Sequence, residues 1–220
     1  MQGKVVIFDL DGTLLDTVAD LGAAVNYALE LRGFPTHTPE EYRSMVGHGV
    51  RDLVSKALPA GKEDLTDGVL ADFKEYYTSH IDVYTRPYPG MQELLKKLND
   101  SGISLAIASN KFQEGTERLA EEFFPGIPFA AILGNRPGYP LKPDPEIVRE
   151  ALRSAGYSEA EAAAPCGQAV MVGDSRSDML TAANGGIRGI AVTWGYRTLE
   201  PSPSYTLVSS PQELERALLR

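Results

Sequence analysis

Two carboxylates, one residue apart, follow the first apolar run of the chain in the segment KVVIFDLDGT, residues 4–13. In an extended chain the side chains of Asp9 and Asp11 point to the same side, which brings two negative charges close together. Two such carboxylates repel each other and perturb each other's pKa unless a cation or a proton lies between them. The segment therefore indicates a cation site, or alternatively a strand end followed by an Asp-Gly turn with solvated acids.

Polar residues also follow the other apolar runs. They are Ser109, Asn110 and Lys111 after one run, Asp174, Ser175 and Asp178 after another, and Lys142 just before a predicted helix start. Because the carboxyl ends of parallel strands converge, we expect three or four aspartates, one serine and one lysine around one small volume. Clusters rich in carboxylate oxygens suit a hard divalent cation, above all Mg²⁺. A hydroxyl, a lysine and a nearby helix N-terminus suit a phosphate.

Several other chemistries lack support in the sequence. The histidines (His37, His48 and His80) are scattered without zinc-ligand spacing, and neither a P-loop nor a GxSxG serine-hydrolase motif is present. The single cysteine, Cys166, has neighbours that supply neither a base nor a cation, so we expect a loop or small packing residue there. The remaining hypothesis is metal-assisted phosphoryl transfer with a carboxylate nucleophile.

The elements that would position these residues follow an α/β pattern. Continuous apolar runs predict buried parallel strands at 5–8, 104–109, 129–133, 169–173 and 189–193. Amphipathic segments predict helices between them, in GMQELLKKLNDSG (90–102), DPEIVREALRSAG (144–156) and SRSDMLTAANGG (175–186). Strands alternating with helices at this spacing predict a Rossmann-like parallel sheet with right-handed crossovers.

A long segment separates the first two predicted strands, and its pattern predicts helices throughout. Helices are expected at about 17–32, from Thr38 onward, and near 50–58 and 63–80; Thr38, Pro39 and Glu41 form the signature of a capping box. We therefore expect an α/β core domain (1–15 and 87–220) with an inserted helical cap domain (16–86). Such a cap would lie at the carboxyl end of the sheet, where open α/β folds bind ligands.

Composition restricts the partners and the compartment. The 220 residues carry 21 Lys plus Arg against 30 Asp plus Glu, a formal net charge of −9. This acidic balance argues against nucleic acid or an anionic membrane as the main partner. The one cysteine cannot form an intramolecular disulfide, and neither a signal peptide nor a long apolar segment is apparent. We expect a cytoplasmic protein, either a monomer or a homodimer.

Four segments, taken in order, carry a resemblance to a known family. DLDGTLLD (9–16), SNK (109–111), LKPDP (141–145) and GDSRSD (173–178) resemble the four motifs of the haloacid-dehalogenase-like (HAD) phosphohydrolases, over essentially the whole chain. Within that superfamily, DLDGTLLDTVADLGAAVNYAL (9–29), GHGVRDLV (47–54) and VTWGYR (192–197) are most similar to phosphoglycolate-phosphatase-type members.

The resemblance implies roles for individual residues. Asp9 would be the nucleophile and Asp11 the general acid and base, a pairing typical of phosphate-ester cleavage. Mg²⁺ would be held by the Asp9 carboxylate, the Asp11 backbone carbonyl and Asp174, with Asp178 in support. The phosphoryl oxygens would be bound by Ser109 and Lys142, and Asn110 and Thr13 are assigned to the same phosphate site.

Local alternatives stay open for several of these residues. Ser109 and Asn110 could cap the helix expected near Phe112. Asp174 and Asp178 could be an N-cap and a first-turn acid of their own helix. Lys142 could be a solvated loop lysine. In the insertion, Gly47 and Gly49 allow close backbone approach, and His48 and Arg51 could reach a substrate carboxylate; the alternative is an inter-helix turn with surface side chains. Trp194 and Tyr196 are expected to cover the sheet end.

The function expected from the sequence is Mg²⁺-dependent hydrolysis of a small phosphorylated metabolite, with 2-phosphoglycolate as the leading substrate. A pyrophosphatase or a sugar phosphomutase on the same scaffold is the alternative among enzymes. A non-catalytic phosphate-sensing protein is the alternative outside enzymes, although the intact set of Asp9, Asp11, Ser109, Lys142 and Asp174 argues against it.

Overall fold

The core of the protein is a parallel sheet, seen in a computed structural model that describes residues 4–164, 167 and 169–219. Its six strands run in the order β5-β4-β1-β6-β7-β8. They are β1 (Val5–Phe8), β4 (Ser104–Phe112), β5 (Phe129–Asn135), β6 (Ala169–Gly173), β7 (Arg188–Val192) and β8 (Tyr205–Val208). All five predicted strands are present, and the α/β fold class is confirmed. Strand β8, at the edge of the sheet, was not predicted.

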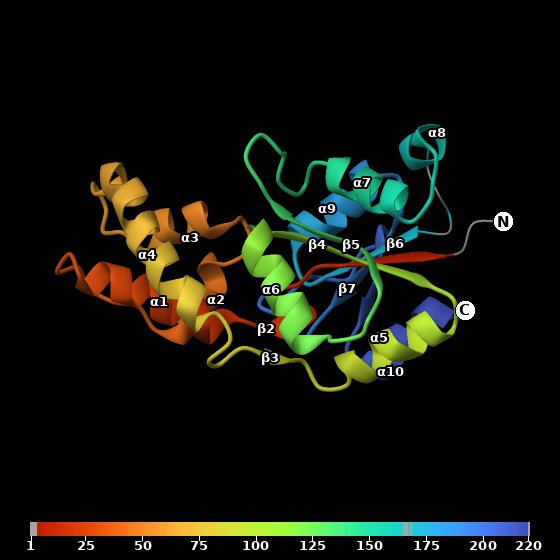
Figure 1. Ribbon diagram of the computed structural model, residues 1–220, viewed down its shortest axis with the longest axis horizontal. Helices are drawn as coiled ribbons and strands as arrows, with labels where there is room; N and C mark the ends of the chain where they lie inside the picture. The colour runs from red at the N-terminus through yellow and green to blue at the C-terminus, as the bar shows by residue number, and fades with distance from the viewer. Residues whose placement is uncertain (1–3, 165–166, 168, 220) are drawn as a thin grey trace.

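The central strand β1 is buried on both faces because helices cover both sides of the sheet (Figure 1). Val6 and Phe8 pack with α5 (Met91–Asp100), α6 (Gln113–Phe123) and α10 (Pro211–Leu219). Val5 and Ile7 pack with α7 (Glu146–Ser154), α8 (Glu159–Ala163) and α9 (Arg176–Asn184). Burial of each such side chain contributes about 1.5–3 kcal/mol, so an apolar run without polar interruption is what this position requires.

The long insertion is helical, as predicted. It forms α1 (Val18–Glu30), α2 (Pro39–Met45), α3 (Val50–Ala57), a short 3₁₀ turn η1 (Glu63–Leu65) and α4 (Thr66–His80). The capping box of α2 is confirmed: the Thr38 hydroxyl accepts from the Glu41 amide, and the Glu41 carboxylate accepts from the Thr38 amide at 2.7 Å. Phe73 and Tyr77 of α4 are fully buried in the apolar core cluster that also contains residues of α1.

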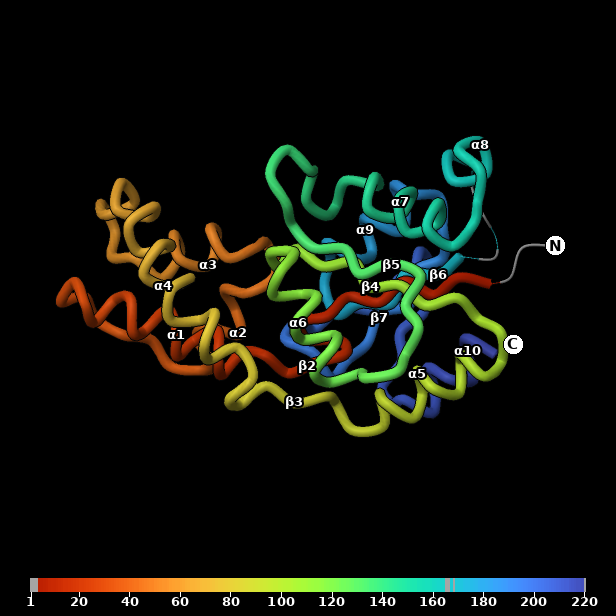
Figure 2. The backbone as a smooth tube through the Cα atoms, in the orientation of Figure 1, coloured from red at the N-terminus to blue at the C-terminus, as the bar shows by residue number. Residues whose placement is uncertain are grey.

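These four α-helices gather beside the carboxyl edge of the sheet rather than over its faces (Figures 1 and 2). Two chain segments connect them to the sheet, and they pair as a short antiparallel ribbon, β2 (Leu15–Asp16) with β3 (Arg86–Pro87). The boundaries predicted between residues 15 and 16 and between 86 and 87 fall within this ribbon. The division into two domains stays a prediction.

The C-terminal third contains elements that the sequence did not predict. Helix α8 lies in the segment 158–168 and begins with a capping box between Ser158 and Glu161. Helix α10 follows β8 and packs Leu214 and Leu218 into the core. Cys166 lies outside the described residues, so its expected role as a packing residue is not addressed. No helix in the described part of the chain is both long enough and apolar enough to cross a membrane.

Candidate active site

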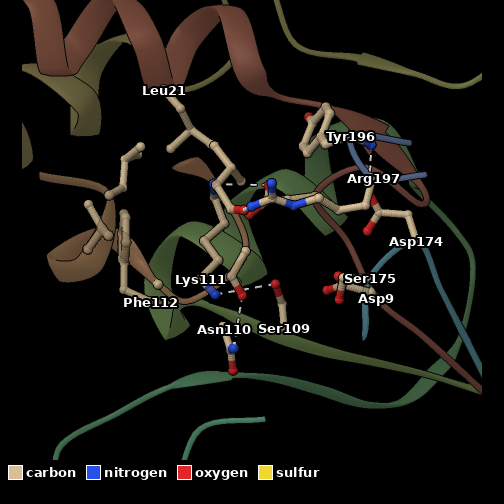
Figure 3. Close-up of a pocket in the computed structure, with 16 residues that line it drawn as sticks. Asp9, Leu21, Ser109, Asn110, Lys111, Phe112, Asp174, Ser175, Tyr196 and Arg197 are labelled. Carbon is tan, nitrogen blue, oxygen red and sulfur yellow. Dashed lines mark hydrogen bonds and ion pairs between the residues drawn. The ribbon is translucent and has the colours of Figure 1, made fainter. Parts of the chain in front are cut away.

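The residues singled out by their chemistry converge at the carboxyl edge of the sheet. Asp9 directly follows β1 and its amide extends the ladder to β6, donating to the Val172 carbonyl at 2.9 Å. Ser109 lies near the end of β4, Asp174 follows β6, and Lys142 lies in the segment between β5 and α7. A cavity of about 40 Å³ opens among the loops at this edge and the neighbouring helices (Figure 3).

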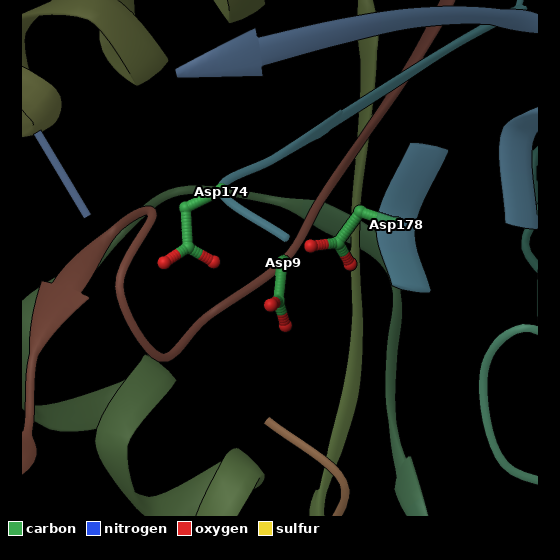
Figure 4. A group of neighbouring side chains, drawn as sticks. All are labelled: Asp9, Asp174 and Asp178. Atoms are coloured by element: carbon green, nitrogen blue, oxygen red, sulfur yellow. The ribbon is translucent and has the colours of Figure 1, made fainter. Parts of the chain in front are cut away.

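Three buried carboxylates form the floor of the site. Asp9, Asp174 and Asp178 each offer one oxygen atom within 4.8 Å of the others, and none of the three residues is more than 8% exposed (Figure 4). Three negative charges at this spacing in a buried position are unfavourable without a counter-charge. A buried set made only of carboxylate oxygens fits a hard divalent cation.

Lys142 supplies the positive charge present in the protein itself. Its ammonium, 2% exposed, donates to Asp178 Oδ1 at 2.6 Å and lies 2.8 Å from Asp9 Oδ1. Burial alone would lower the pKa of this lysine, but the Asp178 and Asp9 carboxylates outweigh it and raise the pKa above its ordinary value. Lys142 is therefore a buried cation of the site, and its interpretation as a solvated loop lysine is wrong.

One lysine does not balance three carboxylates. Burial, together with Asp178, raises the pKa of Asp9 to about 8, even though Lys142 opposes the shift. Burial and Asp178 likewise raise the pKa of Asp174 to about 7, against the hydrogen bond from the Tyr196 amide. At neutral pH the cluster therefore retains protons, and a bound divalent cation would displace them.

These shifts predict how stability depends on pH. Both pKa values are raised above the ordinary value of 3.8, so the folded chain binds protons that the unfolded chain has released. In the absence of metal, the contribution of Asp9 and Asp174 to the free energy of unfolding should therefore decrease from about pH 4 to about pH 8. We expect Mg²⁺ to raise the melting temperature more at about pH 8 than at about pH 6. Thermal melts with Mg²⁺ or EDTA measure this; an equal or larger gain at the lower pH would contradict it.

The Asp174 carboxylate lies in a tight backbone enclosure. Its Oδ2 accepts from the Tyr196 amide at 2.6 Å. A Cβ atom on Gly12 would lie 2.4 Å from Asp174 Oδ2, and one on Gly195 would lie 2.3 Å from the same oxygen. Both distances are far below van der Waals contact, so only glycine at these two positions permits this orientation of the carboxylate.

The substitution Gly195→Ala is therefore expected to displace Asp174 and weaken divalent-cation binding by about 10- to 100-fold, the range typical of disturbed metal-ligand support. Calorimetric titration with Mg²⁺ measures the change. The matched control is Gly68→Ala in α4, where the new Cβ would meet only the tip of the Arg32 side chain, at 3.0 Å. Unchanged affinity in Gly195→Ala would show that Asp174 does not need this enclosure.

Asp178 has both carboxylate oxygens engaged within the protein. Oδ1 accepts from Lys142, and Oδ2 accepts from the Ser175 amide at 3.0 Å and from the Ser175 hydroxyl at 2.5 Å. Ser175, not Asp174, is the N-cap of α9, and Asp178 completes its capping box. The interpretation of Asp174 as the cap is wrong. Asp178 is a first-turn acid, as the alternative proposed, and it is also the partner of Lys142.

The Asp11 carboxylate is held by two partners at the rim of the cavity. Its Oδ1 accepts from the Thr17 hydroxyl at 2.6 Å and lies 3.3 Å from the Lys111 ammonium. Lys111 also donates to the Tyr77 hydroxyl of α4 at 2.7 Å, and its side chain is 2% exposed. The sequence assigned no role to Lys111. The SNK motif contained it, but only the folded chain brings it to Asp11.

Ser109 and Asn110 take different positions. Ser109 lines the cavity and its hydroxyl accepts from the Lys111 amide at 3.3 Å. The Asn110 side chain accepts from the Lys142 amide at 2.9 Å and donates to the carbonyl oxygens of Lys142 and Gly47. The side-chain amide of Asn110 thus links the backbone at Lys142 to Gly47 of the helical insertion. Neither residue caps α6, whose N-cap is Phe112, so that interpretation is wrong.

The remaining predicted residues lie farther from the acidic cluster. Thr13 is fully buried, and its hydroxyl has no hydrogen-bond partner among the described residues. Gly47 lines the cavity, whereas His48 is exposed and lines two neighbouring hollows. Arg51 forms an ion pair with Asp67 of the helical insertion and does not line the cavity. The structure thus brings Gly47 to the cavity, and His48 and Arg51 face elsewhere.

The segment after β7 contributes residues whose roles the sequence did not reveal. The Trp194 indole donates to the Thr13 carbonyl, and the Tyr196 hydroxyl accepts from the Thr17 amide at 2.6 Å. Arg197 lines the cavity and donates to the Val46 carbonyl at 2.7 Å. Tyr196 and Arg197 both connect the sheet edge with the inserted segment, a function that no local sequence pattern signals.

Comparison with known proteins agrees with this geometry. A sequence model described as haloacid dehalogenase-like hydrolase matches residues 6–192. A protein of Mesorhizobium japonicum named phosphoglycolate phosphatase is 36% identical over 211 residues, covering 92% of this chain and 90% of its own. A protein of Pseudomonas aeruginosa named phosphoglycolate phosphatase 1 is 37% identical over 206 residues, covering 90% of this chain and 72% of its own.

A solved structure also resembles the whole chain. The crystal structure of a candidate phosphoglycolate phosphatase from Lactobacillus delbrueckii subsp. bulgaricus superimposes with a TM-score of 0.85 at 33% sequence identity. The match covers 99% of each chain, so both the sheet and the helical insertion have counterparts in it.

Proposed function

The chain belongs to the haloacid dehalogenase-like hydrolase family as a phosphoric monoester hydrolase, and on that premise we propose that it hydrolyses 2-phosphoglycolate with Mg²⁺, through an aspartyl-phosphate on Asp9. The observation that carries the proposal is the contact of Asp9 with Lys142 beside Asp174, at the floor of a cavity. A nucleophilic carboxylate, a phosphate-binding cation and a carboxylate metal ligand are then within one small volume.

Asp9 and Lys142 act on the phosphoryl group. One Asp9 oxygen attacks phosphorus as the bond from phosphorus to the ester oxygen breaks. Lys142 and the Ser109 hydroxyl bind the phosphoryl oxygens and stabilise their charge in the transition state. Asp9 must be ionised for this attack, and its raised pKa of about 8 in the metal-free site supports the binding of a further cation. Asn110 keeps Lys142 in place through its two backbone hydrogen bonds.

Asp11 moves the proton in both half-reactions. It donates a proton to the departing ester oxygen, which leaves as glycolate, and then takes a proton from the water that attacks phosphorus and releases inorganic phosphate. The carboxylate is thus returned to its starting state, and Asp9 is regenerated. The Thr17 hydroxyl and the Lys111 ammonium, both on Asp11 Oδ1, orient the group for these transfers.

Mg²⁺ would be held by the Asp9 carboxylate, Asp174 and the Asp11 backbone carbonyl. Asp178 would support it indirectly, since both of its oxygens are already bonded to Lys142 and Ser175. When bound, the ion neutralises charge on the phosphoryl oxygens and keeps Asp9 ionised.

The helical segment 16–86 is proposed as a cap domain over the core formed by 1–15 and 87–220. Gly47 contacts Asn110, and Val46 contacts Arg197, so the turn before α3 closes the cavity from the cap side. The names of the relatives favour phosphoglycolate as the substrate. The cytoplasmic location and the choice between monomer and homodimer stay predictions.

A panel of phosphate compounds tests the proposal. Phosphate release is measured from 2-phosphoglycolate, a sugar phosphate, pyrophosphate and a nucleotide, with Mg²⁺ and then with EDTA. We expect preference for 2-phosphoglycolate and loss of release with EDTA that Mg²⁺ restores. Preference for pyrophosphate, isomerisation of a sugar phosphate without net release, or activity unaffected by EDTA would contradict the proposal in its substrate, reaction or cofactor, respectively.

A further inference from the structure

Arg197 places a positive charge in the cavity, and no carboxylate of the described residues forms an ion pair with it. Its side chain reaches from the loop after β7 across the space between Ser109 and Leu21 (Figure 3). In the described ranges 4–164, 167 and 169–219, no Asp or Glu forms an ion pair with it, and its hydrogen bond goes to a neutral carbonyl, that of Val46, at 2.7 Å. A guanidinium offers five N–H donors, so this single bond leaves most of them unused.

The other cations of the site are already committed. Lys142 is bonded to Asp9 and Asp178, and Lys111 lies against Asp11 and donates to Tyr77. Both ammonium groups are therefore offset by protein carboxylates. Arg197 differs from them because its charge, partly buried at the cavity wall, has no such partner in the described structure. A partly desolvated, unpaired cation that faces a cavity favours an anion from the solution.

Arg197 is also fixed in position from both ends. Its neighbour Tyr196 is anchored by its amide to Asp174 and by its hydroxyl to the Thr17 amide. The guanidinium itself is held by the Val46 carbonyl on the cap side. A donor that is already ordered loses little side-chain entropy when it binds a ligand, which makes it effective in discrimination.

Part of the cavity wall is apolar. Leu21, Val50 and Leu53 of the helical insertion line the cavity, together with Phe112 at the end of β4. These four side chains offer no hydrogen bonds to the hydroxyl groups of a sugar, and burying such groups unpaired is costly. The combination of one guanidinium with an apolar wall suits a short carbon chain that ends in an anion.

We propose that Arg197 is the specificity-determining residue that binds a carboxylate on the leaving group of a short phosphate ester. Resting on the proposed phosphatase function, this inference names the substrate class as two- or three-carbon phosphate esters that carry a carboxylate. The phosphoryl group lies at Asp9 and Lys142, and the carboxylate accepts hydrogen bonds from Arg197.

Binding without turnover separates this inference from the proposed reaction. In an Asp9→Asn background with Mg²⁺, calorimetric titration compares 2-phosphoglycolate with ethyl phosphate, which has two carbons but no carboxylate. Arg197→Gln should weaken binding of 2-phosphoglycolate by about 10- to 100-fold, the effect of a lost charge-assisted hydrogen bond, and leave ethyl phosphate within about threefold. Arg197→Lys should recover part of the loss, because it restores the charge without the planar fork.

Substitutions of two other arginines serve as comparisons for Arg197→Gln. Arg149→Gln removes a guanidinium that pairs with Glu146 on the exposed side of α7, and it should change neither affinity. Arg51→Gln removes the arginine that pairs with Asp67 of the insertion. If Arg51→Gln, rather than Arg197→Gln, weakened binding of 2-phosphoglycolate selectively, the inference would be overturned.

The remaining outcomes are also decisive. If Arg197→Gln weakened the binding of both esters equally, the residue would only hold the cap through Val46, and the inference would be overturned. The inference would also be overturned if Arg197→Gln left the binding of 2-phosphoglycolate unchanged, or if the Asp9→Asn protein bound neither ester. Arg197-dependent binding of 2-phosphoglycolate, together with no hydrolysis of it when Asp9 is intact, would contradict the proposed reaction and leave the binding role of Arg197 supported.

Discussion

Replacing Asp9 by Asn is expected to reduce phosphate release by on the order of 10⁵-fold in kcat, comparable with the loss of other enzyme nucleophiles. The amide is close in shape to the carboxylate but cannot form the bond to phosphorus. The Asp9 side chain is buried, accepts from the Leu10 amide at 2.7 Å and lies beside Lys142. Steady-state assays of the purified variant, with Mg²⁺ present, measure the change.

The Asp9→Asn variant should nevertheless fold. The substitution removes one negative charge from a cluster in which burial and Asp178 raise the pKa of Asp9 to about 8. At about pH 8 the metal-free variant should therefore melt at the same temperature as the unmodified protein or higher. Activity within about tenfold of the unmodified protein would contradict the assignment of Asp9, as would a loss of activity that merely follows unfolding.

The second large effect is expected from Lys142→Met. Removal of the ammonium leaves Asp9 and Asp178 buried without their cation, and breaking a buried ion pair in this way typically costs about 3–5 kcal/mol. Methionine keeps the length of the apolar stem, so the loss reflects the charge. The free energy of unfolding from urea titration, without metal and at neutral pH, measures it. Phosphate release should also fall by on the order of 10³-fold because a transition-state donor is lost.

A double mutant distinguishes the two losses. Lys142→Met combined with Asp178→Asn removes one positive and one negative charge, so part of the unfolding free energy should return. Catalysis should not return, because phosphate binding needs the ammonium itself. Equal and additive destabilisation by the two substitutions would contradict the coupling of Lys142 with Asp178, and recovery of activity in the double mutant would contradict the role of Lys142 in catalysis.

The sheet and its neighbouring helices were predictable because their signals are local. The run VVIF at 5–8 has no polar interruption, and strand β1 is completely buried on both faces. The capping box at Thr38 likewise depends only on residues three positions apart. Strand β8 was missed because it is short and mostly accessible: Val208 is its only buried residue, and Thr206 is exposed. A four-residue strand without a continuous apolar run cannot be distinguished from a loop by its sequence pattern.

The positions of the acidic residues were predictable for a related reason. Parallel strands end at one edge, so Asp9 and Asp174 had to meet wherever the strand assignments were correct. No comparable rule determines which way the side chains of the insertion point. Arg51 was expected at the substrate and pairs with Asp67, while Lys111 and Arg197, to which no role was given, line the cavity. Their places depend on how the insertion packs on the sheet, which is information that no short stretch of sequence contains.

The central claim, that Asp9 takes up the phosphoryl group, is tested most directly by trapping it in an Asp11→Asn variant. With para-nitrophenyl phosphate the leaving group needs no proton, so the first step should proceed, while the second should stall without a base. We predict a burst of about one nitrophenolate per enzyme molecule, and mass spectrometry after acid quench should find the phosphate on Asp9. Phosphate on another residue, or continued turnover with Asp9 unmodified, would contradict the account.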